Sequence, residues 1–171
     1  MDDEIINRVA KSSIETIDLK TFKGSREKIL FDLKENLSHG YVLKEKEFRG
    51  FIKKMNWESY SNRSVALTCS VDAIIPSWAY MLVISKLEGH AEKVVIGNLE
   101  DLEKSIYMEK INSFDFSVYK DKKVVIKGCS DLTFVNSIYV EITKKLLPFA
   151  DSIMYGEPCS TVPIYKKKKN R

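Results

Sequence analysis

The stretch Val65-Ala66-Leu67-Thr68-Cys69-Ser70-Val71-Asp72 decides the fold, because a similar stretch, Val124-Val125-Ile126-Lys127-Gly128-Cys129-Ser130-Asp131, follows 59 to 60 residues later. Each opens with a short apolar, β-branched run that favours a buried strand, and each ends in Cys-Ser and an aspartate. Matching residues continue on both sides of the two stretches in the same order. We infer an internal repeat that spans approximately residues 57–97 and 116–156.

Each copy has the pattern of a strand, a helix and a second strand. The expected strand, helix and second strand are residues 63–68, 77–89 and 93–96 in the first copy, and 124–127, 135–147 and 152–155 in the second. Strands that alternate with helices typically form parallel sheets. We therefore predict an α/β fold with a mainly parallel sheet that is built from two repeated βαβ units.

The first 62 residues are expected to form an N-terminal α+β extension of this core. Residues 14–22 and 28–33 resemble strands, and residues 43–55 have the spacing of an amphipathic helix. No linker or low-complexity segment interrupts the chain, so the prediction is a single domain over residues 1–171. Between the copies, Asn98 is expected to cap a further helix.

Composition and charge limit the function classes. The apolar content of 44% and the charged content of 30% are those of a soluble globular protein. No apolar run reaches the ~18 residues of a membrane span, and the acidic start lacks the apolar region of a signal peptide. We expect a cytoplasmic protein, in which three cysteines form no disulfide framework.

The net charge of +4 is concentrated at the C-terminus. Residues 166–171 carry five of the positive charges and no apolar side chain, so we expect a flexible basic tail. The rest of the chain is then close to neutral, which argues against a dedicated nucleic-acid-binding protein. The sequence leaves the oligomeric state open.

The three cysteines are the strongest candidates for chemistry. Cys69, Cys129 and Cys159 each follow an expected strand and precede a serine. Ligands of open parallel sheets bind at the carboxyl ends of the strands, and a helix N-terminus after Cys69 and Cys129 favours a thiolate. Three thiolates can bind a zinc ion or an iron–sulfur cluster. The alternative is that the cysteines are small buried residues at tight turns.

Polar neighbours of the cysteines could complete such a site. The candidates for a fourth or supporting ligand are Asp72, Asp131 and Glu157. The candidates for binding a small anion, through backbone N–H groups, are Ser70, Gly128, Ser130 and Ser160. A sharp turn explains the glycine equally well.

A catalytic cysteine is the alternative function. One cysteine would be the nucleophile, with Asp72 or Asp131 as the orienting carboxylate, and the substrate a small anion. No Cys-x-x-Cys pair, phosphate-binding glycine loop or arginine shortly after a cysteine is present. His90 is expected at the opposite end of the sheet from Cys69. A scaffold with structural cysteines is the third possibility.

Four strings resemble a known family. They are residues 65–80 (VALTCSVDAIIPSWAY), 124–131 (VVIKGCSD), 156–165 (GEPCSTVPIY) and 43–48 (LKEKEF). The family is an uncharacterised bacterial one, catalogued as domain of unknown function 2480, and its pattern includes Cys69, Asp72, Cys129 and Cys159. Its members are often encoded beside sulfur-mobilisation genes for iron–sulfur assembly. The resemblance therefore implies a cytoplasmic accessory of iron–sulfur cluster assembly, with iron–sulfur assembly proteins as partners.

Overall fold

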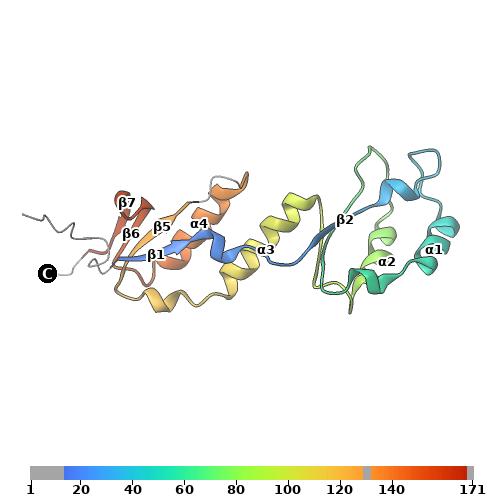
Figure 1. Ribbon diagram of the computed structural model, residues 1–171. Coiled ribbons are helices and arrows are strands. Elements are labelled where there is room, and N and C mark those ends of the chain that lie inside the picture. The colour runs from blue at the N-terminus through green and yellow to red at the C-terminus, as the bar shows by residue number, and fades with distance from the viewer. Residues whose placement is uncertain (1–13, 129–131, 169–171) are drawn as a thin grey trace, which may run out of the picture. The chain divides into compact units, whose positions relative to one another are not determined.

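The strands of the described residues, 14–128 and 132–168, lie in two sheets in a computed structural model (Figure 1). The sheets belong to two compact units. The inserted unit consists of Gly24–Ile106, and the terminal unit is built from the two ends of the chain, up to Lys23 and from Tyr107 onward. Each unit has its own sheet and its own apolar core, so each is described by itself.

The sheet of the terminal unit has the strand order β1-β5-β6-β7. Its strands are β1 (Ile14–Asp18), β5 (Lys123–Lys127), β6 (Ser152–Glu157) and β7 (Ser160–Lys166). The first three strands are parallel, and β7 returns antiparallel to β6 after a tight turn. Helix α4 (Val135–Leu146) buries Ile138, Ile142 and Leu146 in the core of this unit. The C-terminal half of α3 (Leu99–Ser113) adds Tyr107 and Ile111.

The sheet of the inserted unit has the order β2-β3-β4 and is fully parallel. Its strands are β2 (Lys28–Asp32), β3 (Ser64–Thr68) and β4 (Lys93–Ile96). Helices α1 (Glu45–Lys54) and α2 (Ser77–Leu87) contribute Phe48, Ile52, Ala79, Val83 and Leu87 to the larger core of this unit. A smaller cluster joins Ala66 to Leu102 and Ile106 of α3.

The two units repeat the same elements. Four 3₁₀ helices are described, η1 (Leu19–Phe22), η2 (Leu33–Asn36), η3 (Trp57–Tyr60) and η4 (Phe116–Tyr119). In each unit, one 3₁₀ helix follows the first strand and another precedes the second strand. The terminal unit therefore has the element order β1-η1-η4-β5-α4-β6, and the inserted unit has the matching order β2-η2-η3-β3-α2-β4. Backbone hydrogen bonds also recur, because Asn62 N donates to His90 O and Asp121 N donates to Phe149 O, 59 residues later.

The predicted α/β class and the two βαβ units are confirmed, because β3-α2-β4 and β5-α4-β6 each join parallel neighbouring strands. The strands form two sheets, however, where one was expected. The segments interpreted as an N-terminal extension supply the first strand of each sheet, β1 and β2. Apolar periodicity indicates a strand without indicating its neighbour, which explains the difference.

The first two residues of the predicted flexible tail, Lys166 and Lys167, are held in place by hydrogen bonds or strand pairing. Lys166 is the last residue of β7 and pairs with Ser152. Lys167 continues the contact, because its backbone N donates to Asp151 O at 2.8 Å and its Nζ lies 3.2 Å from Asp121 Oδ1. Strand β7 was not predicted, since Pro163 removes a backbone donor from its middle.

Candidate functional site

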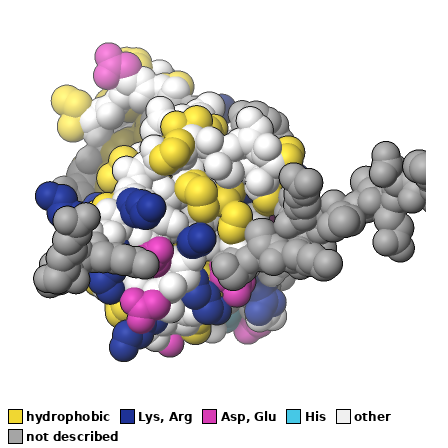
Figure 2. Space-filling model, turned by 90° about the vertical axis from the view of Figure 1, so that its left-hand side faces the viewer, with side chains coloured by type: hydrophobic (Ala, Val, Ile, Leu, Met, Phe, Trp, Pro, Cys, Tyr) yellow, Lys and Arg dark blue, Asp and Glu magenta, His cyan; other side chains and the backbone are white. Residues whose placement is uncertain are grey.

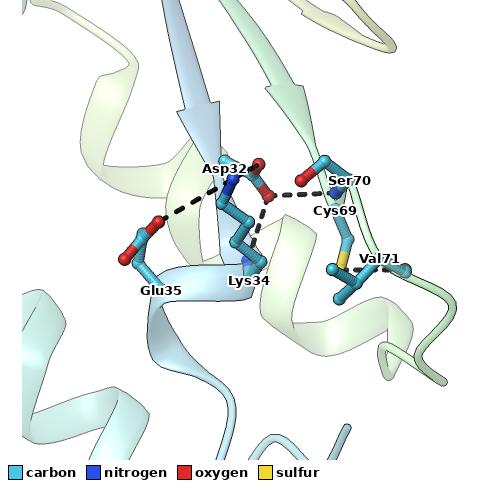
Figure 3. Close-up of polar contacts among 6 residues, drawn as sticks. All are labelled: Asp32, Lys34, Glu35, Cys69, Ser70 and Val71. Carbon is cyan, nitrogen blue, oxygen red and sulfur yellow. Dashed lines mark hydrogen bonds and ion pairs between the residues drawn. The ribbon is translucent and has the colours of Figure 1, made fainter. Parts of the chain in front are cut away.

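Polar groups converge at the carboxyl end of the sheet in the inserted unit (Figure 3). Asp32 ends β2, and Cys69 and Ser70 follow the neighbouring strand β3. The Asp32 Oδ1 accepts hydrogen bonds from the backbone N of Ser70 and of Lys34, both at 3.0 Å. The Lys34 Nζ lies 3.6 Å from the other carboxylate oxygen, Oδ2. Asp32 therefore joins the ends of two adjacent strands and begins η2.

The surroundings of Asp32 favour its ionised form. Its side chain is 10% exposed, and burial by itself would raise the pKa. The hydroxyl of Ser70, the two backbone N–H groups and the charge of Lys34 outweigh burial, so the pKa of Asp32 lies below its usual value. Sequence reasoning missed this residue. The available signal was the repeated Asp-Leu-Lys that starts at Asp18 and at Asp32.

Cys69 is half-buried and directly precedes Ser70, whose backbone N donates to the Asp32 carboxylate. Its Sγ lies 3.6 Å from the carbonyl oxygen of Val71, to which the thiol donates a weak hydrogen bond. Burial raises the pKa of the Tyr80 hydroxyl on α2, and the charge of Cys69 raises that pKa further. The backbone N of Ser70, a predicted anion-binding residue, donates a hydrogen bond to Asp32 Oδ1.

A pocket of about 570 Å³ opens beside the loop that follows Cys69. It is lined by Tyr41, Val42, Leu43, Asp72, Ala73, Ile74 and Pro76. Asp72 is the one acidic residue among the described residues of this lining, and Pro76 precedes the first residue of α2. The pocket thus combines an apolar wall with one carboxylate and a helix N-terminus. Pro76 holds the N-cap position of α2 without a side-chain hydrogen bond.

The carboxyl end of the sheet in the terminal unit carries a different set of side chains. Gly128 follows β5, and the hydroxyl of Tyr139 occupies the place where a side chain at this position would lie. The ring of Tyr139 meets that of Tyr155 edge to face, with centroids 5.2 Å apart. A side chain at 128 would have to displace the Tyr139 hydroxyl, which gives a steric reason for glycine at this position, and anion binding by Gly128 stays a prediction. Cys129, Ser130 and Asp131 lie outside the described residues.

Cys159 lies exposed in the turn between β6 and β7. Glu157, which ends β6, is held by Lys127 at the end of β5, with 3.1 Å between Nζ and Oε2. Ser160 begins β7 and is exposed. The thiol of Cys159 and the Lys127–Glu157 pair therefore share the carboxyl end of this sheet.

The described cysteines are divided between the units. Cys69 belongs to the inserted unit and Cys159 to the terminal unit, and both thiols are free. Within residues 14–128 and 132–168, no three His, Cys, Asp or Glu side chains are grouped so that they could hold a metal ion. We expected all three cysteines to follow strands of one sheet. That expectation is wrong for Cys69 and Cys159, because β3 and β6 belong to different sheets.

Surface charge and helix length add two observations. On the face shown in Figure 2, Lys and Arg side chains are interspersed with Asp, Glu and hydrophobic side chains, so that face carries charges of both signs. In the described part of the chain, every helix is too short or too polar to cross a membrane.

Comparison with known proteins identifies one family. A search of curated proteins and a search of solved structures each find no match. The sequence model of the family described as Protein of unknown function (DUF2480) matches residues 3–167. This match covers both units and all three cysteine positions, as the resemblance of the four strings predicted. The chain therefore belongs to the DUF2480 family.

Proposed function

We propose that the protein binds a metal ion or an iron–sulfur cluster through Cys69, Cys129 and Cys159. One observation supports this proposal above the others. Strands β5 and β6 are parallel neighbours, with Ile126 opposite Tyr155, and a cysteine follows each of them within four residues. Cys69 follows the equivalent strand of the inserted unit directly. Thiols at strand ends suit ligand binding by an open sheet.

The donor set suits soft metals. Thiolates select zinc and iron–sulfur clusters over hard cations, and carboxylates from Asp72, Asp131 or Glu157 would complete the coordination. Glu157 would exchange its ion pair with Lys127 for the metal. Binding would displace protons from the thiols, so the affinity for metal would rise with pH.

The proposal also assigns a place and partners. A cytoplasmic protein keeps its thiols reduced, as metal binding requires. Iron–sulfur assembly proteins are the partners that would load or unload a cluster. In this reading the protein carries its metal or cluster as cargo and catalyses no reaction of its own.

The test starts with the full chain, purified without oxygen and analysed for zinc, iron and acid-labile sulfide. We expect stoichiometric metal or cluster, directly or after reconstitution with ferrous iron and sulfide. Cys129→Ser and Cys159→Ser should each lower the bound amount, and Ser160→Ala is the matched neutral control. A chain that binds neither metal nor sulfide after reconstitution contradicts the proposal.

Cys69→Ser separates two versions of the site. If all three thiols share one ligand, Cys69→Ser lowers the bound amount as much as the other two changes do. Unchanged stoichiometry in Cys69→Ser would show that Cys129 and Cys159 act without it, and the three-cysteine site would be wrong. Circular dichroism of each variant confirms that its fold is intact.

A second candidate function is a thiol enzyme that acts on a small anion. The observation that favours it is the pocket of about 570 Å³, in which Asp72 and the start of α2 lie beside the loop after Cys69. We expect iodoacetamide to label half-buried Cys69 faster than exposed Cys159, with phosphate protecting Cys69. Equal labelling of the two thiols, insensitive to phosphate, would rule this candidate out.

A further inference from the structure

The open edge of the sheet in the inserted unit carries an apolar surface. Among the strands that the structure describes, β4 lies at the edge of this sheet, and Ile96 on it is 68% exposed. Met81 and Ile84 of α2 are 67% and 38% exposed beside it. A shallow pocket of about 290 Å³ joins them, lined by Leu67, Tyr80, Met81, Ile84, Val94 and Ile96. None of these six described lining residues carries a charge.

The terminal unit shows what covers the equivalent edge. Strand β6 corresponds to β4, and β7 adds to it in antiparallel fashion. Ile153 and Tyr155, the equivalents of Val94 and Ile96, pair with residues of β7. Tyr165 of β7 packs against the core of that unit. An antiparallel strand is therefore the occupant that this fold already uses at this edge.

Backbone groups of β4 are directed toward such an occupant. Gly97 N donates to Leu67 O at 3.0 Å, so Gly97 turns its backbone toward β3. The direction of the backbone N–H and C=O groups alternates from residue to residue along a strand. The groups of Val95 therefore also point toward β3, and those of Val94 and Ile96 point toward the open edge. Unpaired edges of this kind are templates for strand addition.

We propose that a second copy of this chain covers this edge, with the two β4 strands paired antiparallel about Val95. A two-fold axis perpendicular to the sheet puts Val94 opposite Ile96 of the other copy, and both residues expose the backbone groups that this register pairs. The same axis brings the Met81 and Ile84 surfaces of the two α2 helices together. The interface is self-complementary, as two-fold symmetry demands.

Charge favours this register. Pairing about Val95 places Lys93 opposite Gly97 of the other copy. The carboxylate of Asp101 occupies the place where a side chain at Gly97 would lie, and it accepts a hydrogen bond from Asn98 N. The pairing therefore brings each Lys93 next to Asp101 of the other copy, twice per dimer, and the Lys93 side chain would exchange its interaction within its own chain for that carboxylate.

Sedimentation equilibrium of the full chain tests the dimer. We expect the wild type to be a dimer, and Met81→Lys to raise the dissociation constant on the order of tenfold or more. Val140→Lys is the matched control, because Val140 is the equivalent residue on α4 and is 59% exposed. It should leave the dissociation constant unchanged. A monomeric wild type, or a dimer that Met81→Lys leaves intact, would overturn the proposal.

Charge reversal tests the register. Lys93→Glu and Asp101→Lys should each weaken the homodimer, because like charges then face each other at both contacts. Mixing the two variants should restore dimers, since a heterodimer contains one reversed pair and one native pair. Circular dichroism confirms that each variant is folded before mixing. Folded variants that form no heterodimer would overturn the pairing about Val95.

Discussion

At the scale of single residues, Asp32 and Gly156 show how polar and steric constraints fix the ends of strands. The Asp32 carboxylate accepts a hydrogen bond from the backbone N of Ser70 and so links the ends of β2 and β3. The Asp32 side chain is 10% exposed. Gly156 adopts a φ of +121° within β6, where the chain approaches the turn to β7. Asp32 provides a charged acceptor at the end of a strand, and Gly156 adopts a positive φ at which an L-residue would be strained.

Asp32→Asn should lower the free energy of unfolding at pH 7 by about 1–2 kcal/mol, the scale of a lost charged hydrogen bond. Because the pKa of Asp32 is lowered in the folded protein, its contribution is present above the unfolded pKa of about 4 and is lost as the pH falls through the folded value. Urea unfolding from pH 7 to pH 2 should therefore show the two proteins converging in acid.

The control for this change is Glu35→Gln. The Glu35 carboxylate lies 4.0 Å from the same Lys34 Nζ, but its side chain is 74% exposed. We expect an effect within about 0.5 kcal/mol. If the Asp32→Asn difference persisted unchanged at pH 2, the ionised carboxylate would not be its source.

Gly156→Ala should destabilise the protein by about 1–3 kcal/mol, because an L-residue is strained at this positive φ. A Cβ at this position would also lie 2.6 Å from the carbonyl oxygen of Ser160, a backbone atom that cannot yield easily. Gly50→Ala is the control, because Gly50 lies within α1 with open space around it. That change should stabilise the protein by about 0.5–1 kcal/mol. Guanidinium unfolding measures both, and equal effects would contradict the strain.

At the scale of elements, α3 begins with a reciprocal cap that the sequence predicted. Asn98 Oδ1 accepts from the backbone N of Glu100 at 2.8 Å and of Asp101 at 3.0 Å. The Asp101 carboxylate accepts in return from Asn98 N at 2.9 Å. The cap fixes where the helix begins, directly after the turn at Gly97 that ends β4.

Asn98→Ala should therefore cost about 1 kcal/mol of stability, since the side chain satisfies two backbone donors at once. Ser77→Ala at the first residue of α2 is the comparison, because no side chain caps that helix. Its expected effect is within about 0.5 kcal/mol. Thermal unfolding of both variants gives the difference, and a cost for Ser77→Ala that matched Asn98→Ala would show that the cap contributes nothing specific.

Elements were predictable where a local pattern defines them. The strands and helices of the two repeats follow from apolar runs, from Gly89 and from the offset of 59 residues. The pairing of β1 with β5 joins Ile14 to Lys123, and no local pattern reports such a distant contact. The bond from Ser70 to Asp32 escaped prediction for the same reason. Strand β7 escaped because Pro163 argues against a strand locally.

The candidate site was predictable in part. The sequence singled out the carboxyl ends of the strands, and the structure places Cys69, Cys159, Glu157 and Ser160 at such ends. The sequence did not show that Cys69 follows a strand of one sheet and Cys159 a strand of the other. The repeat gives the order of the elements along the chain and not which strands pair. The steric constraint at Gly128 comes from Tyr139, a contact between side chain and backbone that only the packed fold defines.

At the scale of the whole molecule, one repeat is inserted into the other. Strand β1 and η1 begin the terminal unit, the inserted unit follows from Gly24 to Ile106, and the chain then returns to complete the first sheet. The terminal unit thus depends on pairing between β1 and β5, which are far apart in sequence, whereas the inserted unit is continuous. Continuous units close shorter loops when they fold.

We therefore predict that a fragment of residues 24–113 folds by itself, since it contains β2, β3, β4, α1, α2 and the whole of α3. Tyr107 and Ile111 pack in the core of the terminal unit, so both are changed to Lys in the fragment to keep it soluble. Circular dichroism should show helical signal and a single cooperative thermal transition. Its length is within the range of domains that fold alone.

The matched control is residues 34–113 with the same two changes, which lacks β2 and the Asp32 carboxylate. Without β2, β3 loses one of its two hydrogen-bonded neighbours, and the larger core loses Phe31 and Leu33. Removing two such buried side chains costs about 4–10 kcal/mol, which is comparable to the total stability of a small domain. The control should therefore be unfolded. If the longer fragment were unfolded as well, the inserted unit would not be stable without the terminal unit, and the contribution of each core would have to be measured in the full chain.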